Sequence, residues 1–253
     1  MTLPYFAEVL GEGEPVLLLH GWGASAASLG AIPAALAEAG FQAHALDLPG
    51  FGAAPPPPTP WCVADYGEWV RAYLDEQQLN PVRLVGHSFG GRLSLYLAAT
   101  YPQRVRQLVL TSAAGVRPSL PPRLRFYYAV RRALLRLLSL PGLRRLEPSV
   151  RAWLFARMAS ADARAAAAQD PVMYETLKRV VNEDLLPLAP RIQAPTLLIW
   201  GDQDDATPLA QGQALEAAIP DAGLVVLAGA GHYAYAERQA EFIRIVQHFF
   251  LTP

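Results

Sequence analysis

Cysteine is almost absent from this chain, which has one, Cys62, among 253 residues. A single cysteine excludes an intramolecular disulfide framework and is compatible with a reducing compartment. No run of about 18 uncharged apolar residues occurs, so we expect no transmembrane helix. The first residues also lack the basic segment followed by an apolar segment that a secretory signal requires. We therefore expect a cytoplasmic protein.

The chain also has almost no net charge, since it contains 21 basic and 22 acidic residues. A formal charge of −1 gives no reason to expect a nucleic acid as a partner. The balance hides one local excess, because residues 116–157 contain ten arginines and one acid, Glu147. These arginines fit a solvated surface, the attraction of an acidic substrate, or docking to an anionic membrane surface. Membrane docking is the least favoured of the three.

Short apolar runs alternate with helix-like segments along most of the sequence. Six runs are typical of strands covered on both faces of a parallel sheet: residues 16–19, 41–46, 82–85, 108–111, 196–200 and 224–227. Five segments have a composition typical of helices: 29–39, 63–78, 92–100, 211–218 and 238–250. The alternation predicts an α/β fold with a mostly parallel central sheet and helices on both faces.

Residues 115–187 interrupt this alternation and show no convincing strand. Helical spacing recurs inside them, with blocks at 149–158 and 171–182. We therefore predict a core domain formed by residues 1–114 and 188–253, into which a helical segment of residues 115–187 is inserted. The aromatic side chains of the insertion would either line an apolar pocket or form its own core: Phe126, Tyr127, Tyr128, Trp153 and Phe155.

The segment Gly86–Gly91, with the sequence GHSFGG, directly follows one of the predicted strands. It predicts a strand, a one-residue turn and a helix, with Ser88 at the tip in strained backbone. Glycines two residues before and after Ser88 fit, because no side chain can occupy so tight a crossing. A serine here is also typical of a helix N-cap. A nucleophilic role therefore requires a base and an orienting acid elsewhere in the chain.

Five histidines are candidates for the base. Four lie in or beside predicted strands, turns and helices, where structural roles or simple solvation are favoured: His20, His44, His87 and His248. The fifth, His232, lies in a glycine-rich loop just after the last predicted strand. Loops that follow the carboxyl ends of parallel strands gather around a ligand crevice. We therefore expect His232 on the same rim of the sheet as Ser88.

The acid is expected on that rim too, after another strand. The loop after residues 196–200 offers three carboxylates: Asp202, Asp204 and Asp205. Spacing alone does not choose between them, and such carboxylates also serve loops and helix caps.

Five segments, in this order, resemble the motifs of the α/β-hydrolase family. They are the HGxG loop at residues 20–23, a D-x-P-G-x-G segment at 47–52, the nucleophile elbow at 86–90, an acid loop at 201–208 and a final G-H-x-x-x-x-E at 231–237. One departure follows Gly52, where Ala53-Ala54-Pro55 replaces a frequent serine. The resemblance covers nearly the whole chain. It implies that Ser88 is the nucleophile, Asp204 the orienting acid and His232 the base.

The resemblance also implies the rest of the site. The backbone N–H groups of Trp22 and Phe89 would form the oxyanion hole, and residues 115–187 would be a helical cap over the active site. The reaction needs no metal and no organic cofactor. The expected partner is a small-molecule ester.

The implied activity is a carboxylesterase acting on short- to medium-chain acyl esters. A serine nucleophile disfavours haloalkane dehalogenation, for which the family uses an aspartate at this position. Two alternatives stay open: hydrolytic C–C cleavage of a meta-cleavage diketone, and a ligand-binding protein without turnover.

Overall fold

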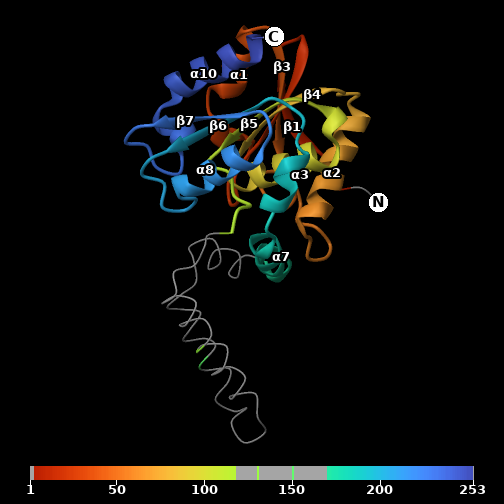
Figure 1. The fold of residues 1–253 in the computed structure, drawn as a ribbon. Helices are drawn as coiled ribbons and strands as arrows, with labels where there is room; N and C mark the ends of the chain where they lie inside the picture. The colour runs from red at the N-terminus through yellow and green to blue at the C-terminus, as the bar shows by residue number, and fades with distance from the viewer. Residues whose placement is uncertain (1–2, 118–129, 131–149, 151–169, 253) are drawn as a thin grey trace, which may run out of the picture.

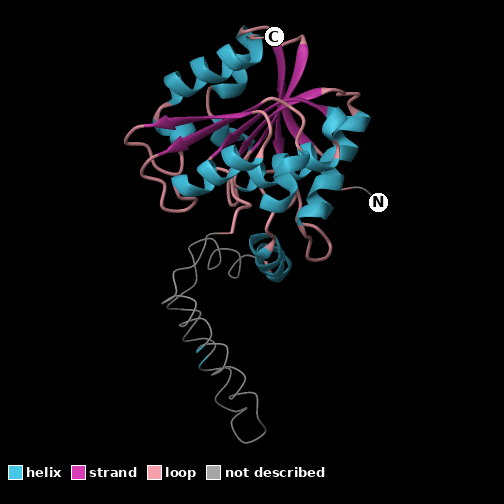
Figure 2. Cartoon of the chain, in the orientation of Figure 1, coloured by secondary structure: helices cyan, strands magenta, loops and turns pink. Residues whose placement is uncertain are grey.

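A seven-stranded sheet forms the centre of the computed structural model, which describes residues 3–117, 130, 150 and 170–252 (Figures 1 and 2). The strand order is β1-β3-β2-β4-β5-β6-β7. Their bounds are β1 Phe6–Leu10, β2 Glu14–Leu19, β3 Phe41–Asp47, β4 Val82–His87, β5 Val105–Thr111, β6 Thr196–Gly201 and β7 Ala222–Leu227. All six predicted strands are confirmed, as β2 to β7, and every pairing among them is parallel.

Of the strands in the described part of the chain, only the edge strand β1 was not predicted by the apolar runs. It pairs antiparallel with β3, with Phe6 opposite Asp47 and Leu10 opposite Ala43. Four of its five residues are exposed, so it lacks the continuous apolar run that marks the buried strands. The sheet is therefore mostly parallel, with one antiparallel edge.

Helices cover both faces of the sheet, as predicted. The longer ones are α1 Ile32–Glu38, α2 Val63–Glu76, α3 Phe89–Thr100, α7 Pro171–Asn182, α8 Leu209–Ala218 and α10 Gln239–Leu251. Short helices connect them: η1 Ala26–Leu29, η2 Pro102–Arg104, η3 Leu186–Arg191 and α9 Ala234–Glu237. Helices α1 and α10 lie on one face of the sheet, and α2, α3 and α8 lie on the other (Figure 1).

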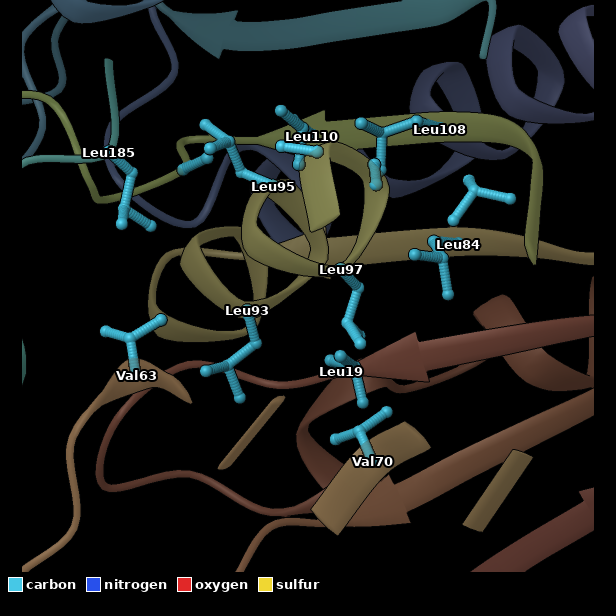
Figure 3. Packing of buried hydrophobic residues seen from close by; sticks show 14 of the residues in the cluster. Leu19, Val63, Val70, Leu84, Leu93, Leu95, Leu97, Leu108, Leu110 and Leu185 are labelled. Carbon is cyan, nitrogen blue, oxygen red and sulfur yellow. The ribbon is translucent and has the colours of Figure 1, made fainter. Parts of the chain in front are cut away.

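Alternation along the strands divides the buried side chains between two cores. In β2, Leu17 and Leu19 join the cluster under α2 and α3, whereas Val16 and Leu18 join the cluster under α1 and α10. Figure 3 shows the first cluster, where Leu97 of α3 lies close to Leu19 and Leu84 of the sheet. Full burial of such a leucine contributes roughly 1.5–3 kcal/mol to folding. The carboxyl end of β4 is therefore held between two packed layers.

The last helix-like block of the predicted insertion forms α7, with the bounds expected from the sequence. The carboxylate of Asp170 caps it by accepting from the N–H of Val172 at 2.6 Å. The helix is attached to the core, because Thr176 Oγ1 accepts from the N–H of Trp61 at 3.1 Å and Leu177 is buried in the same hydrophobic cluster as α2 and α3.

The rest of the predicted cap, with its five aromatic residues and most of its arginines, lies outside the described residues. The two-part division at residues 115 and 187 therefore stays a prediction, as do the three interpretations of the arginines. None of the helices in the described part of the chain has the length and apolarity needed to cross a lipid bilayer.

Candidate active site

Ser88 is the only residue between the end of β4 and the start of α3. Its backbone has φ 50° and ψ −109°, in the left-handed half of the conformational map that non-glycine residues rarely occupy. Hydrogen bonds hold it there: its N–H donates to Thr111 O at 3.2 Å, and its carbonyl accepts from Arg92 N and Ala114 N, both at 3.0 Å. The one-residue turn and the strained backbone expected from the sequence are thus both present.

The glycines around Ser88 are required by close approaches of backbone. A Cβ on Gly90 would lie 2.1 Å from the carbonyl oxygen of Leu19, and a Cβ on Gly86 would lie 2.6 Å from the carbonyl oxygen of Gly90. The N–H of Gly90 also donates to His20 O at 3.0 Å. The elbow is therefore packed directly against the loop that follows β2.

The structure brings Ser88, His232 and Asp204 into one chain of hydrogen bonds. His232 Nε2 lies 3.0 Å from Ser88 Oγ. On its other side, His232 Nδ1 lies 3.0 Å from Asp204 Oδ2 and 3.1 Å from Oδ1. A carboxylate can only accept, so Nδ1 carries the hydrogen and Nε2 is free to accept the serine proton. This geometry can activate a serine hydroxyl for attack on a carbonyl carbon.

Asp204 is the carboxylate of its loop that reaches the histidine. It is 5% exposed, whereas Asp202 and Asp205 are exposed, and Asp202 accepts instead from the N–H of Gly229 at 2.7 Å. Burial alone would raise the pKa of Asp204. The hydrogen bonds from His232 and Thr207 outweigh it and lower the pKa to about 2. Asp204 is therefore ionised at neutral pH and can stabilise a charged imidazole.

Thr207 is a site residue that the sequence reasoning missed. Its Oγ1 lies 2.8 Å from Asp204 Oδ2, 3.3 Å from His232 Nδ1 and 3.0 Å from the carbonyl oxygen of Ser112. Its N–H also donates to Asp204 Oδ1 at 2.9 Å. It occupies an unspecified position of the acid-loop motif, so no signal in the sequence identified it.

Two further residues hold the His232 loop. His87 Nε2 donates to the carbonyl oxygen of His232 at 3.0 Å, and burial beside that histidine lowers the pKa of His87 to about 3. Glu237 accepts from the N–H groups of Gly231 and Tyr233, at 2.8 and 3.3 Å, one on each side of His232. The final acid of the G-H-x-x-x-x-E motif was the available signal for Glu237, and the structure shows its positioning contacts.

His20 has a structural role, as expected, because both of its ring nitrogens form hydrogen bonds. Its Nδ1 donates to Gly21 O at 2.8 Å, and its Nε2 accepts from Leu48 N at 3.0 Å. Burial lowers its pKa, so the ring stays neutral and keeps both bonds. His20 thereby ties the HGxG loop to the chain after β3.

The two predicted oxyanion donors lie beside Ser88. Phe89 begins α3, and the first N–H groups of a helix have no partner inside it. Within the described part of the chain, neither its N–H nor that of Trp22 has a protein acceptor. The rings of the two residues are in edge contact, with centroids 5.2 Å apart. Their role as an oxyanion hole stays a prediction.

A pocket of about 290 Å³ opens at Ser88 and His232. Trp22 and Phe89 form part of its wall, and residues from α7 and α8 complete it. Across the described ranges, no group of three or more His, Cys, Asp or Glu residues is arranged to hold a metal ion.

A serine on a one-residue elbow after a central parallel strand, with a histidine and an aspartate on the same rim, defines a hydrolase of the α/β class. Residues 14–239 match the family described as the alpha/beta hydrolase fold. The chain belongs to the alpha/beta hydrolase family.

Two relatives of similar sequence identity to this chain have names that describe different hydrolytic reactions. It is 30% identical over 257 residues to a pimeloyl-[acyl-carrier protein] methyl ester esterase of Chromobacterium violaceum, covering 94% of this chain and 95% of the relative. It is 29% identical over 255 residues to a 2-hydroxy-6-oxononadienedioate/2-hydroxy-6-oxononatrienedioate hydrolase of Cupriavidus pinatubonensis, covering 93% and 86%. Among solved structures, a meta-cleavage product hydrolase of Pseudomonas fluorescens IP01 is similar, with a TM-score of 0.72, 25% identity and coverage of 97% and 93%.

Proposed function

We propose that this protein is a serine hydrolase that cleaves carboxylic esters through an acyl-enzyme on Ser88. The observation that carries the proposal is the continuous chain of hydrogen bonds from Ser88 Oγ through His232 to Asp204, with distances of 3.0 Å at each link. Ser88 and His232 line one pocket together with Trp22 and Phe89, as an acyl-transfer site requires.

In the proposed mechanism, His232 Nε2 takes the proton of Ser88 as Oγ attacks the ester carbonyl carbon. Asp204 holds the imidazole and stabilises its charged form. The N–H groups of Trp22 and Phe89 bind the developing oxyanion, and the fixed backbone suits them for charge that appears only in the transition state. His232 then gives the proton to the leaving alcohol. Water, activated by the same histidine, hydrolyses the acyl-enzyme and regenerates Ser88.

The pocket and the relatives support short- to medium-chain esters as substrates. About 290 Å³ is near the lower end of the volumes that small-molecule sites occupy, roughly 300–1,000 Å³. The Chromobacterium violaceum relative is named as a methyl ester esterase, which favours ester cleavage with a small alcohol.

Replacement of Ser88 tests the proposal. Ser88→Ala should lower kcat on 4-nitrophenyl butyrate by at least about 10⁴-fold, while the circular dichroism spectrum and Tm stay near those of the wild type. Ser28→Ala is a matched control, because Ser28 is exposed and, among the described residues, its hydroxyl bonds only the carbonyl oxygen of Ser25. Turnover by Ser88→Ala within tenfold of the wild-type rate would contradict the assignment.

Hydrolytic C–C cleavage is the second candidate, and the likeness to the Cupriavidus pinatubonensis and Pseudomonas fluorescens hydrolases favours it. A meta-cleavage dienone acid, assayed beside 4-nitrophenyl esters of increasing chain length, separates the two reactions. Rapid turnover of acetate or butyrate esters supports the esterase. Turnover of the dienone alone supports the C–C hydrolase, and turnover of neither indicates a ligand-binding protein.

A further inference from the structure

Arg92 is a buried cation beside the nucleophile for which the proposed mechanism has no use. It lies one helical turn after Ser88 in α3 and is 6% exposed. It also lines the pocket that contains Ser88 and His232. A buried charge costs several kcal/mol of solvation unless an opposite charge compensates it. The partners of Arg92 therefore indicate whether it serves the fold or a ligand.

The guanidinium has one described hydrogen bond, from Nη1 to the backbone carbonyl oxygen of Glu183 at 2.6 Å. No described carboxylate forms an ion pair with it. The Glu183 carboxylate accepts instead from Val63 N at 2.9 Å, and that of Asp184 lies near the N–H groups of Arg117 and Leu186. Burial lowers the pKa of Arg92 to about 10, although Glu183 and Asp184 act against it. The side chain is still a cation at neutral pH, and no carboxylate among the described residues lies within ion-pair distance of it.

A second buried polar side chain lines the same pocket. Gln211 of α8 is 8% exposed, and its side-chain amide has no hydrogen-bond partner among the described residues. Its amide atoms are not among the fully buried, unpartnered polar atoms of the described residues, so the amide is accessible to a ligand group that enters the pocket. Much of the remaining wall is apolar, including Leu177, Val180 and Val116. The pocket thus combines an apolar surface with one guanidinium and one amide.

We propose that Arg92, assisted by Gln211, binds a carboxylate carried by the substrate, so that the enzyme prefers half-esters of short dicarboxylic acids. This inference rests on the proposed ester hydrolysis at Ser88. Four residues of α-helix rise about 6 Å, so the carboxylate and the scissile carbonyl would be separated by only a few methylene groups. Guanidinium has five N–H donors in a planar fork that matches a carboxylate, and one described bond leaves donors for the substrate.

Two methyl esters of equal length test the proposal: monomethyl glutarate, which carries a carboxylate, and methyl pentanoate, which carries a methyl group instead. The wild type should prefer monomethyl glutarate, measured as methanol release. In Arg92→Gln, the ratio of kcat/KM for the two esters should fall on the order of 10- to 100-fold, as for the loss of a charge-assisted hydrogen bond. Arg117→Gln is the matched control, because Arg117 is exposed, its N–H lies near the Asp184 carboxylate, and its replacement should leave the ratio unchanged.

Gln211→Leu provides a second variant that keeps the bond from Arg92 to Glu183. It should lower the same ratio about threefold to tenfold, the effect of one neutral hydrogen bond. Equal losses on both esters in Arg92→Gln and Gln211→Leu would show that these residues serve only the fold, and would overturn the proposal.

A binding measurement on a variant that lacks the nucleophile tests the carboxylate site independently of ester hydrolysis. Glutarate should bind to Ser88→Ala in calorimetry, and the double variant Ser88→Ala/Arg92→Gln should bind it at least about tenfold more weakly. The inference would be overturned if the enzyme cleaved methyl pentanoate but neither cleaved monomethyl glutarate nor bound glutarate. The proposed esterase activity would then still hold. Glutarate binding without turnover of any ester would support the anion site and contradict the proposed function.

Discussion

The ring of His87 donates from Nε2 to the backbone carbonyl oxygen of His232, across 3.0 Å. This bond joins the residue before the nucleophile to the loop that carries the proposed base, and the two rings lie 4.9 Å apart. Because burial keeps His87 neutral, the Nε2 hydrogen is present throughout the ordinary pH range. His87 therefore fixes the position of His232 relative to Ser88 without contacting the reacting atoms itself.

Loss of the donor at residue 87 should lower kcat and leave KM nearly unchanged. His87→Leu removes the bond to His232 O and should lower kcat on 4-nitrophenyl butyrate by about tenfold, equivalent to roughly 1.4 kcal/mol. His87→Gln is the matched control, since a glutamine amide can place an N–H near the position of Nε2. Equal kcat values for the two variants would show that the bond does not position His232.

The same histidine should make the fold sensitive to acid. Its pKa is lowered from 6.5 to about 3, so between these values the unfolded chain binds a proton that the folded chain does not. Stability is therefore lost as the pH falls below 6.5, by about 1.4 kcal/mol per unit. In urea titrations, the wild type should lose about 2 kcal/mol more than His87→Gln between pH 7 and pH 5. Burial also lowers the pKa of His20, but both proteins contain it. Parallel losses in the two proteins would contradict the assignment.

Asp204 should be the one carboxylate of its loop on which activity depends. Asp204→Asn removes the charge that stabilises the imidazolium and permits the wrong tautomer of His232, so kcat should fall by roughly 10³- to 10⁴-fold. Asp202→Asn and Asp205→Asn are the matched controls, because both residues are exposed, and each should stay within about threefold of the wild type. A comparable loss in either control would show that the loop is rearranged during catalysis.

Local patterns predicted the sheet, because buried parallel strands have continuous apolar runs. They missed β1, since an exposed edge strand such as Phe6–Leu10 has none. They also placed the start of the helix after Ser88 at residue 92, three residues beyond its first residue, Phe89. Glycines next to the elbow carry no apolar signal, although Gly90 is already helical.

The site was predicted only in part, for a related reason. Ser88 and His232 stand out in glycine-rich segments, and the resemblance to the family selected Asp204. The supporting contacts join residues far apart in the chain: Thr207 with Ser112 across 95 positions, and His87 with His232 across 145. No local pattern records such contacts. The role of Arg92 could not be predicted from local sequence either, because the pocket that it lines is formed by α3, α7 and α8 together.

Thr207 should act through Asp204. Thr207→Val keeps the shape of the side chain but removes the hydroxyl that lies 2.8 Å from Asp204 Oδ2 and 3.0 Å from Ser112 O. We expect kcat to fall about threefold to tenfold with little change in KM, and the free energy of unfolding to fall by about 1–2 kcal/mol. Thr207→Ser keeps the hydroxyl and should recover most of both values. If Thr207→Val and Thr207→Ser have equal kcat, the hydroxyl does not position the aspartate.

Gly90 should tolerate no side chain, because the elbow is pressed against the loop after β2. A Cβ there would lie 2.1 Å from Leu19 O and 2.7 Å from His20 O, both backbone atoms that cannot rotate away. Gly90→Ala should therefore lower stability by about 3 kcal/mol, at the upper end of the cost of overpacking. It should also move the HGxG loop, so that activity is lost with it. Gly223→Ala is the matched control, because a Cβ at Gly223 meets no atom within 4 Å. A Gly90→Ala protein with wild-type Tm and kcat would contradict the close packing of the elbow.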